Sequence, residues 1–290
     1  MLLLEQLKYL KMKNNFSIIL LFMSIQIYTQ NQKVKDFLKT NYIISELHND
    51  FNNDGLKDDL YIFASNTEKE TKVTTEGMNK RKLLIIFNRN NNNSVYYEND
   101  NIFPCRECTG KSDNDISDLK FEKNILSYKT IIAPFASNNY SVIDFSLKFS
   151  QNSFKLYKYE ETYYKVDEDN DATIKLDNSD IAKIKFNYYD WIANNSWSDH
   201  VLVTNQNVKK LNDFAYSLGN INPSFAIDLL QEIIKKYPNR VVAYLNLADN
   251  YWAINKKDLA KENYKKYIAL MKSQNKDLKR IPKQVWERLK

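Results

Sequence analysis

Glycine, cysteine and histidine are scarce in this 290-residue sequence, which contains four glycines, two cysteines and two histidines. The glycines lie too far apart to form the glycine-rich loops that bind nucleotide phosphates. Neither His48 nor His200 belongs to a recognised catalytic motif, and the chain has no GxSxG or HExxH pattern. We therefore assign no catalytic residues and predict a non-catalytic protein, with a hydrolase that uses acidic loops as the enzymatic alternative.

Long apolar runs are missing as well, because no segment reaches the roughly 20 apolar residues of a transmembrane helix. An apolar stretch at residues 18–27 follows Lys11 and Lys13 and precedes polar residues, and the pattern reads cleanly from Met12. This order predicts a cleaved signal peptide at residues 1–30, with an uncleaved buried helix as the alternative. We expect a periplasmic or secreted protein, and no lipid anchor, because no cysteine lies at the cleavage region.

The two cysteines, Cys105 and Cys108, form a C-x-x-C pair. Outside the cytosol such a pair is typical of a short disulfide. A zinc site needs four ligands, which two cysteines and two distant histidines hardly supply, and a thioredoxin-like site needs a helix that starts at the first cysteine. Pro104 and Gly110 flank the pair and indicate a loop, so we predict a structural disulfide.

The segment from Asp50 to Asp59 carries the most specific chemical pattern in the chain, D-x-N-x-D-G-x-x-D. Calcium takes roughly six to eight oxygen ligands, and alternate residues can supply them where the backbone turns sharply. Gly55 permits that turn because it adopts positive φ without a Cβ clash. The predicted Ca²⁺ ligands are Asp50, Asn52, Asp54 and Asp58 through their side chains and Leu56 through its carbonyl oxygen.

This loop resembles the calcium loops of FG-GAP and similar DxDxDGxxD repeats, in which a strand leaves the ion. The residues that follow, Leu60 to Phe63, are apolar and predict a strand. Tyr61 stands where an EF-hand has its bidentate glutamate, so we expect a modest affinity, with a Kd of roughly 10⁻⁴–10⁻³ M. An Asn/Asp/Gly turn with solvated carboxylates is the alternative interpretation.

Short apolar or alternating segments continue beyond the loop and predict further strands. A short amphipathic helix is predicted before the loop, at residues 33–42. No long helical pattern interrupts this region, so we predict an antiparallel β-rich domain over residues 31–200. The expected strands lie at residues 60–63, 83–87, 95–97, 121–131, 141–149, 154–159 and 174–186.

The hydrophobic period changes to three and four residues near Leu211 and predicts helices. The last part of the chain resembles tetratricopeptide repeats, and the 34-residue spacing between Ala226 and Ala260 is that of one repeat. A small helical bundle is the alternative. The predicted fold class is α+β, with a β-rich domain followed by an all-α, tetratricopeptide-like helical hairpin domain at residues 205–290. The expected helices lie at residues 211–218, 241–252, 257–270 and 279–289.

Stacked repeats of this kind leave a concave groove that binds extended peptides or partner helices. The resemblance places Leu245, Asp249 and Trp252 in that groove as predicted partner-binding residues. Trp252 is the expected anchor, because aromatic side chains dominate the binding energy of many interfaces. The alternative is that Trp252 packs on the β-rich domain.

Residues 40–165 also resemble a group of exported bacterial proteins of uncharacterised function. The shared features are the calcium-type loop at residues 50–58, a C-x-x-C-x-G segment at 105–110, and a strand ending F-x-L-x-x-Y at 154–159. After that C-x-x-C-x-G segment the group has an aromatic and glycine-rich stretch, which Lys-Ser-Asp-Asn-Asp replaces here. The loop and its strand are similar, more distantly, to small calcium-binding periplasmic lysozyme inhibitors.

Charge is divided unevenly along the chain. Residues 205–290 contain 17 Lys and Arg against 8 Asp and Glu, a net charge of +9, whereas residues 31–204 carry −5. In an exported chain, a basic region favours an acidic protein or an envelope surface over nucleic acid. We therefore expect a protein that binds a protein or peptide partner through its helices. An inhibitor or immunity-type protein that blocks a hydrolase is the alternative.

Overall fold

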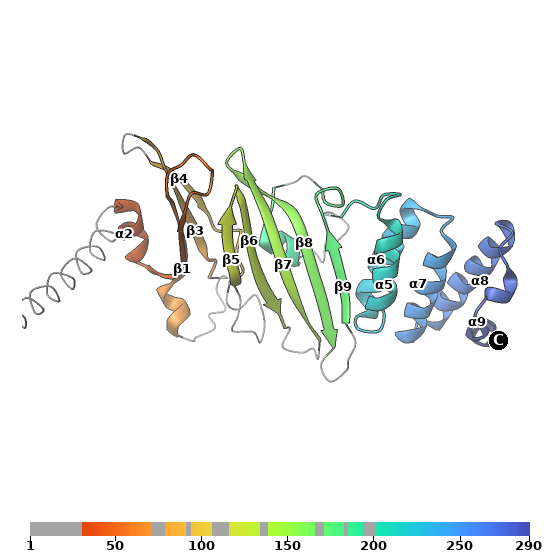
Figure 1. Cartoon of the computed structure of the whole chain (residues 1–290). Coiled ribbons are helices and arrows are strands. Elements are labelled where there is room, and N and C mark those ends of the chain that lie inside the picture. Colours follow the sequence, from red (N-terminus) through yellow and green to blue (C-terminus); the bar gives the residue numbers. More distant parts are fainter. Residues whose placement is uncertain are drawn as a thin grey trace, which may run out of the picture.

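Figure 1 shows an elongated molecule in which two antiparallel sheets are followed by a group of helices at the opposite end. The predicted α+β class is thus confirmed. The predicted signal peptide, Cys108 and His200 lie outside the described part of the chain. The computed structural model describes residues 31–70, 79–90, 94–105, 116–133, 139–165, 171–182, 185–193 and 201–290.

Each sheet is a meander, because every strand pairs antiparallel with the strand that follows it within the sheet. The four-stranded sheet consists of β1 (Asn41–Asn49), β2 (Asp58–Ser65), β3 (Lys82–Asn88) and β4 (Ser94–Asn99). The five-stranded sheet consists of β5 (Ser117–Glu122), β6 (Ile125–Ile132), β7 (Asn139–Ser150), β8 (Ser153–Lys165) and β9 (Asp171–Leu176).

The four-stranded sheet is buried on both faces, which explains the unbroken apolar runs of β2 and β3. Leu60 and Ile62 belong to the core shared with the five-stranded sheet, whereas Tyr61 and Phe63 pack toward helix α2 (Gln32–Leu38). The ring of Phe37 in α2 lies 4.8 Å from that of Phe63. The helix is shorter than predicted, because β1 pairing with β2 begins at Asn41.

Aromatic rings join the two sheets. Phe51, in the loop between β1 and β2, is fully buried and stacks on Phe121 of β5 with ring centroids 4.7 Å apart. Phe149 of β7 contacts Phe87 of β3 at 5.4 Å and Tyr97 of β4 at 4.9 Å. Aromatic pairs at such distances add to the energy of burial, so these rings hold the two sheets together.

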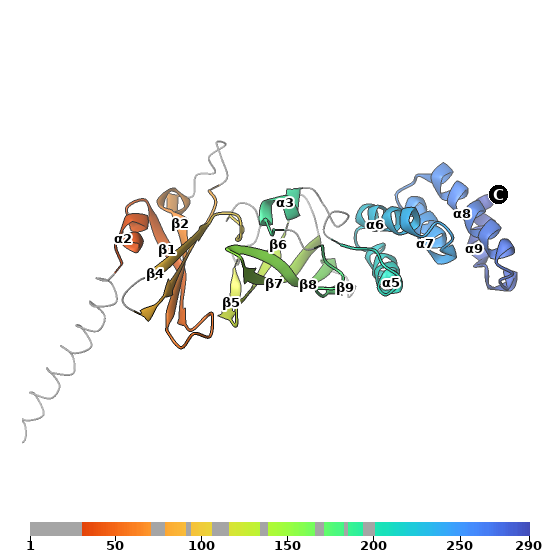
Figure 2. The ribbon, with the colours of Figure 1, turned by 90° about the horizontal axis from the view of Figure 1, so that it is seen from above.

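The five-stranded sheet alternates between a buried face and a polar face, as a half-covered antiparallel sheet should. On the buried face, β7 carries Ile143, Phe145 and Leu147, while Lys129 and Asp144 lie on the polar face. A short helix, α3 (Tyr188–Ala193), covers part of the buried face (Figure 2). The side chain of Tyr188 is fully buried there.

Of the last strands expected within residues 174–186, only β9 is present among the described residues, which leave out 183 and 184, and it ends at Leu176. A turn begins there, in which the Asp180 N–H donates to the carbonyl oxygen of Asp177 at 2.9 Å. Ile181 then forms an isolated bridge with Val201, and Phe186 packs beside Phe145. These side chains are apolar because each enters the core singly from irregular backbone.

The helices after the sheets match the predicted change of period. Each of α5 to α8 packs against the next one along the chain, and α9 packs against α8. Within the described residues, no helix is both long and apolar enough to cross a membrane. The helices are α5 (Val208–Leu218), α6 (Pro223–Lys236), α7 (Val241–Ala253) and α8 (Lys257–Ser273), followed by the 3-10 helix η4 (Leu278–Arg280) and α9 (Lys283–Leu289).

The helices are attached to the free edge of the five-stranded sheet, where α5 packs on β9. The ring of Tyr163 in β8 lies 6.1 Å from Phe214 of α5 and 5.7 Å from Phe225 of α6. Asp180 accepts hydrogen bonds from Lys210 Nζ at 2.5 Å and from Asn207 Nδ2 at 2.9 Å. One continuous core therefore extends from the sheets into the helices.

Candidate functional site

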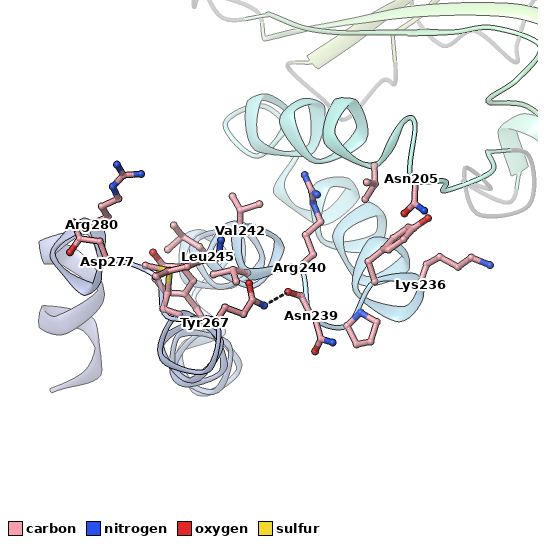
Figure 3. A pocket seen from close by; sticks show the side chains of 16 residues that line it. Asn205, Lys236, Asn239, Arg240, Val242, Leu245, Tyr267, Asp277 and Arg280 are labelled. Carbon is pink, nitrogen blue, oxygen red and sulfur yellow. Dashed lines mark hydrogen bonds between the residues drawn. The ribbon is translucent and has the colours of Figure 1, made fainter.

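A large groove lies among the helices at the ends of α6 and α8 and the beginning of α7 (Figure 3). It encloses about 1010 Å³. Two turns form its rim, one between α6 and α7 and one between α8 and η4. Ligand pockets typically enclose roughly 300–1,000 Å³, so the groove is large enough for a drug-sized ligand or a short peptide segment.

Local sequence explains both turns. Pro238 follows the end of α6, and proline two residues after a helix cannot continue it. Asn275 follows α8 with φ of 52°, in the left-handed region that asparagine tolerates. The N–H of Lys276 donates to Met271 O at 2.9 Å and closes the end of α8. The chain then brings Asp277 and the residues after it over the groove.

The wall of the groove is part apolar and part polar. Val242, which is 40% exposed, and the half-buried Leu245 of α7 supply most of the exposed apolar surface, and the largely buried Tyr267 and Met271 of α8 also line the groove. Gln274 Nε2 donates to the backbone oxygen of Asn239 at 2.7 Å and ties the two turns together, as Figure 3 shows. This bond joins residues 35 apart in the sequence and brings the end of α8 beside the turn after α6.

Four basic side chains line the groove against a single acid among the described lining residues. Lys236, Lys276 and Arg280 are exposed, and Arg240 is half-buried. None of the four forms an ion pair with a described residue. The Arg240 Nε–H is buried and has no hydrogen-bond partner within that part of the chain. The acid, Asp277, caps η4 by accepting from Lys279 N at 2.9 Å.

The three predicted partner-binding residues do not lie together. Leu245 lines the groove, whereas Asp249 and Trp252 lie farther along α7, under α9. Asp249 pairs with Arg288 of α9 at 2.6 Å and accepts from Tyr264 Oη at 2.5 Å. The guanidinium of Arg288 also lies 5.0 Å from the Trp252 ring centre. These two residues therefore hold the last helix in place.

The predicted calcium loop connects β1 to β2 and is closed by its own side chains. Asp50 accepts from Asp54 N at 3.1 Å and from Gly55 N at 2.8 Å. Asn52 Oδ1 accepts from Asp54 N at 2.9 Å, and Asp54 Oδ1 accepts from Leu56 N at 2.9 Å. Gly55 has φ of 86°, so the expected turn is present there. The first three side chains of the pattern thus bind loop N–H groups.

Asp58 differs from the other predicted ligands because it is fully buried. Its two carboxylate oxygens accept from Phe51 N and Asn88 N, each at 3.0 Å. Burial raises the pKa of this carboxyl, the two N–H groups lower it, and the charges of Asp54 and Asp50 raise it further. Asp58 therefore joins the loop to β3.

Within the described residues, no three histidine, cysteine, aspartate or glutamate side chains gather as a metal site would require. A bound Ca²⁺ would have to share the carboxylate oxygens of Asp58 with the two backbone N–H groups that already donate to them. Calcium binding stays a prediction. Cys105 is fully buried, and the predicted disulfide stays a prediction because Cys108 is not described. Near the loop, His48 Nδ1 lies 2.7 Å from Asp59 Oδ1 on an exposed surface.

The β-rich part also contains a buried ion pair and a further buried carboxyl group. Arg81 Nη2 and Glu68 Oε1 are 2.6 Å apart, and their side chains are only 5% and 1% exposed. They border a second cavity of about 500 Å³ between β1 and β5. Glu161 lies on the buried face of β8 and accepts a hydrogen bond from Tyr159 Oη. Burial raises the pKa of Glu161 to about 7.

Comparison of the chain with models of protein families, with curated proteins and with solved structures gives no match. The groove is therefore the feature from which function is inferred. Its basic residues were not predicted individually, although the net charge of +9 over residues 205–290 pointed to this part of the chain. No short sequence motif indicates that the turn after α6 lies beside the turn after α8.

Proposed function

We propose that this protein is an exported, non-catalytic binding protein that holds a protein or peptide partner in the groove of its helical part. The groove itself carries the proposal, because it combines exposed apolar surface with four basic side chains that form no ion pair with a described residue, at the edge of a well-packed core. Interfaces owe most of their energy to a few such apolar anchors surrounded by polar contacts. In this proposal the helices are tetratricopeptide-like repeats, closed by α9.

The sheets have a supporting role in the proposal. The helices share their core with the five-stranded sheet, and Asp180 fixes the start of α5 through Lys210 and Asn207. A groove held by such a scaffold loses less conformational entropy when it binds than a mobile loop does. This arrangement favours a preformed recognition surface.

A displayed library of random dodecapeptides provides the test. Peptides selected on the full chain should bind about fivefold more weakly to the Val242→Gln variant, because an apolar contact worth about 1 kcal/mol is lost. Leu259→Gln is the matched control, since Leu259 is 41% exposed, as Val242 is 40%, but lies outside the groove. Dissociation constants come from fluorescence anisotropy. Failure to select any peptide, or equal weakening in both variants, would contradict the proposed function.

We also propose that the loop at residues 50–58 binds a structural Ca²⁺. Calcium at ten times its Kd should stabilise the chain by about 1.4 kcal/mol, a rise of about 2–4 °C in Tm. Asp54→Ala should abolish that rise, whereas Asp213→Ala, which removes an exposed carboxylate on α5, should keep it. Thermal melts with calcium and with chelator measure the effect. A melting curve that chelation leaves unchanged would reject the site.

A further inference from the structure

We infer that the partner of the groove is a peptide segment rich in Asp and Glu, with apolar side chains between the acids. This inference rests on the proposed function and specifies its ligand. The groove combines four basic side chains, Lys236, Arg240, Lys276 and Arg280, with apolar side chains along its wall. A peptide that alternates the two kinds of residue can meet both surfaces at once.

Charge complementarity selects the acidic partner. Lys236, Arg240, Lys276 and Arg280 together carry four positive charges, and Asp277 supplies the one negative charge among the described lining residues. Elsewhere among the helices some cations are paired, as Lys209 is with Asp213 and Arg288 with Asp249, and others, such as those of α8, lie singly on the surface; the groove differs because four basic side chains line one concavity. Basic side chains concentrated around one concavity raise the local potential and attract acidic groups.

Arg240 is the residue best placed for direct recognition. It immediately precedes α7, and its side chain reaches into the groove between Val242 and Asn205 in Figure 3. The side chain is half-buried and forms no ion pair with a described residue, so it keeps an uncompensated positive charge beside the groove. Arginine presents a planar fork of donors that binds a carboxylate in two parallel hydrogen bonds.

The helix termini around the groove do not decide its charge preference. The end of α6 and the end of α8 contribute partial negative charge, and the beginning of α7 contributes partial positive charge. Lys236 and Lys272 in the last turns of α6 and α8 offset the negative ends. The side-chain charges therefore set the preference.

The apolar wall distinguishes a peptide from an anionic polymer. Val242, Leu245, Tyr267 and Met271 offer no donors to a phosphate-rich strand or a lipid headgroup, apart from the hydroxyl of Tyr267. Apolar side chains of a peptide would bury this surface, at about 25 cal/mol for each Å² removed from water. The groove thus favours a peptide over nucleic acid or a membrane surface.

The experiment compares two charge-reversal variants of the full chain. Lys276→Glu with Arg280→Glu changes the groove, and Lys265→Glu with Lys266→Glu changes exposed residues of α8 outside it. Both double variants alter the net charge by the same amount, so long-range electrostatic effects are matched. The probes are the dodecapeptides selected on the unmodified chain, with single-stranded DNA and phosphatidylglycerol vesicles as the competing anions.

We expect the selected peptides to be enriched in Asp and Glu relative to the library, and to bind about tenfold more weakly to the groove variant but within about twofold to the control. Higher salt should weaken their binding, because exposed charges are screened. Selected peptides that are neutral or basic, yet lose affinity with Val242→Gln, would overturn this inference while leaving the proposed function intact. Tighter binding of DNA or vesicles than of any peptide, reduced in the groove variant, would overturn both.

Discussion

Replacing Arg81 by methionine is expected to lower the free energy of unfolding by about 3–5 kcal/mol. The change removes one member of the buried Arg81–Glu68 pair and leaves the carboxylate of Glu68 in a site where its side chain is 1% exposed. Removing one partner of a buried ion pair is among the most destabilising changes that a folded chain can suffer. Urea unfolding followed by circular dichroism measures the loss.

A double variant isolates the cause. Arg81→Met combined with Glu68→Met removes both charges, and we expect it to recover most of the stability lost by Arg81→Met alone. The exposed pair between Lys33 and Glu98 has the same separation, 2.6 Å, so Lys33→Met is the matched control and should change stability little. Losses that simply add in the double variant would show that the two buried charges act independently.

Raising the pH from 5 to 8 is expected to cost roughly 2–3 kcal/mol of stability through Glu161 alone. Burial raises the pKa of this carboxyl from 4.5 to about 7 in the folded chain. The contribution of Glu161 to the free energy of unfolding is therefore fully present below pH 4.5, where this carboxyl is protonated in both the folded and the unfolded chain. The contribution is lost as the pH rises through 7. Above that pH the folded chain must hold a buried carboxylate beside Tyr159.

Glu161→Gln should remove this part of the pH dependence, because the amide does not ionise. Glu160 is the control, since it lies on the polar face of the same strand and pairs with Lys175 at 2.7 Å. Unfolding midpoints for the chain, Glu161→Gln and Glu160→Gln, measured in urea at several pH values, separate this group from the other titrating residues. Parallel profiles for the unmodified chain and Glu161→Gln would contradict the expectation.

Much of the fold could be predicted because its strongest signals are local. The unbroken apolar runs of β2 and β3 and the alternation of β7 indicated strands, and the change of period indicated helices. The six-residue helix α3 was missed, because six residues are too few to show a helical period. The false extension beyond Leu176 arose because single apolar residues entering a core resemble an alternating strand.

Burial along β8 shows why pattern alone did not identify Glu161. The pairing between β7 and β8 shifts at Ser146 and Leu147, and this irregularity changes which residues face inward. Leu156 is buried before the shift, and Tyr159 and Glu161 are buried after it. Strict alternation from Leu156 would instead have placed Glu160 in the core, because a slip of one residue exchanges the two faces.

The sequence predicted the positive charge of the helical part but not the position of the groove. The repeat pattern indicated a groove, and Leu245 lines the groove described here, yet the pattern could not show that Arg288, 39 residues after Asp249, contacts Asp249 and Trp252. The basic groove instead arises where two turns meet, with the Asn239 and Gln274 contact joining residues far apart in sequence. The spacing of residues within one helix carries no information about which turns contact each other in the folded chain.

The contact of α5 with β9 covers one edge of the five-stranded sheet. A chain that stopped at Leu176 would expose the outer edge of β9, which pairs with β8 on its other side, together with the apolar ring of Tyr163. Open strand edges of this kind recruit other chains into aggregates. By covering this edge, the helices are expected to protect the sheet from self-association, so we expect a chain truncated after β9 to aggregate.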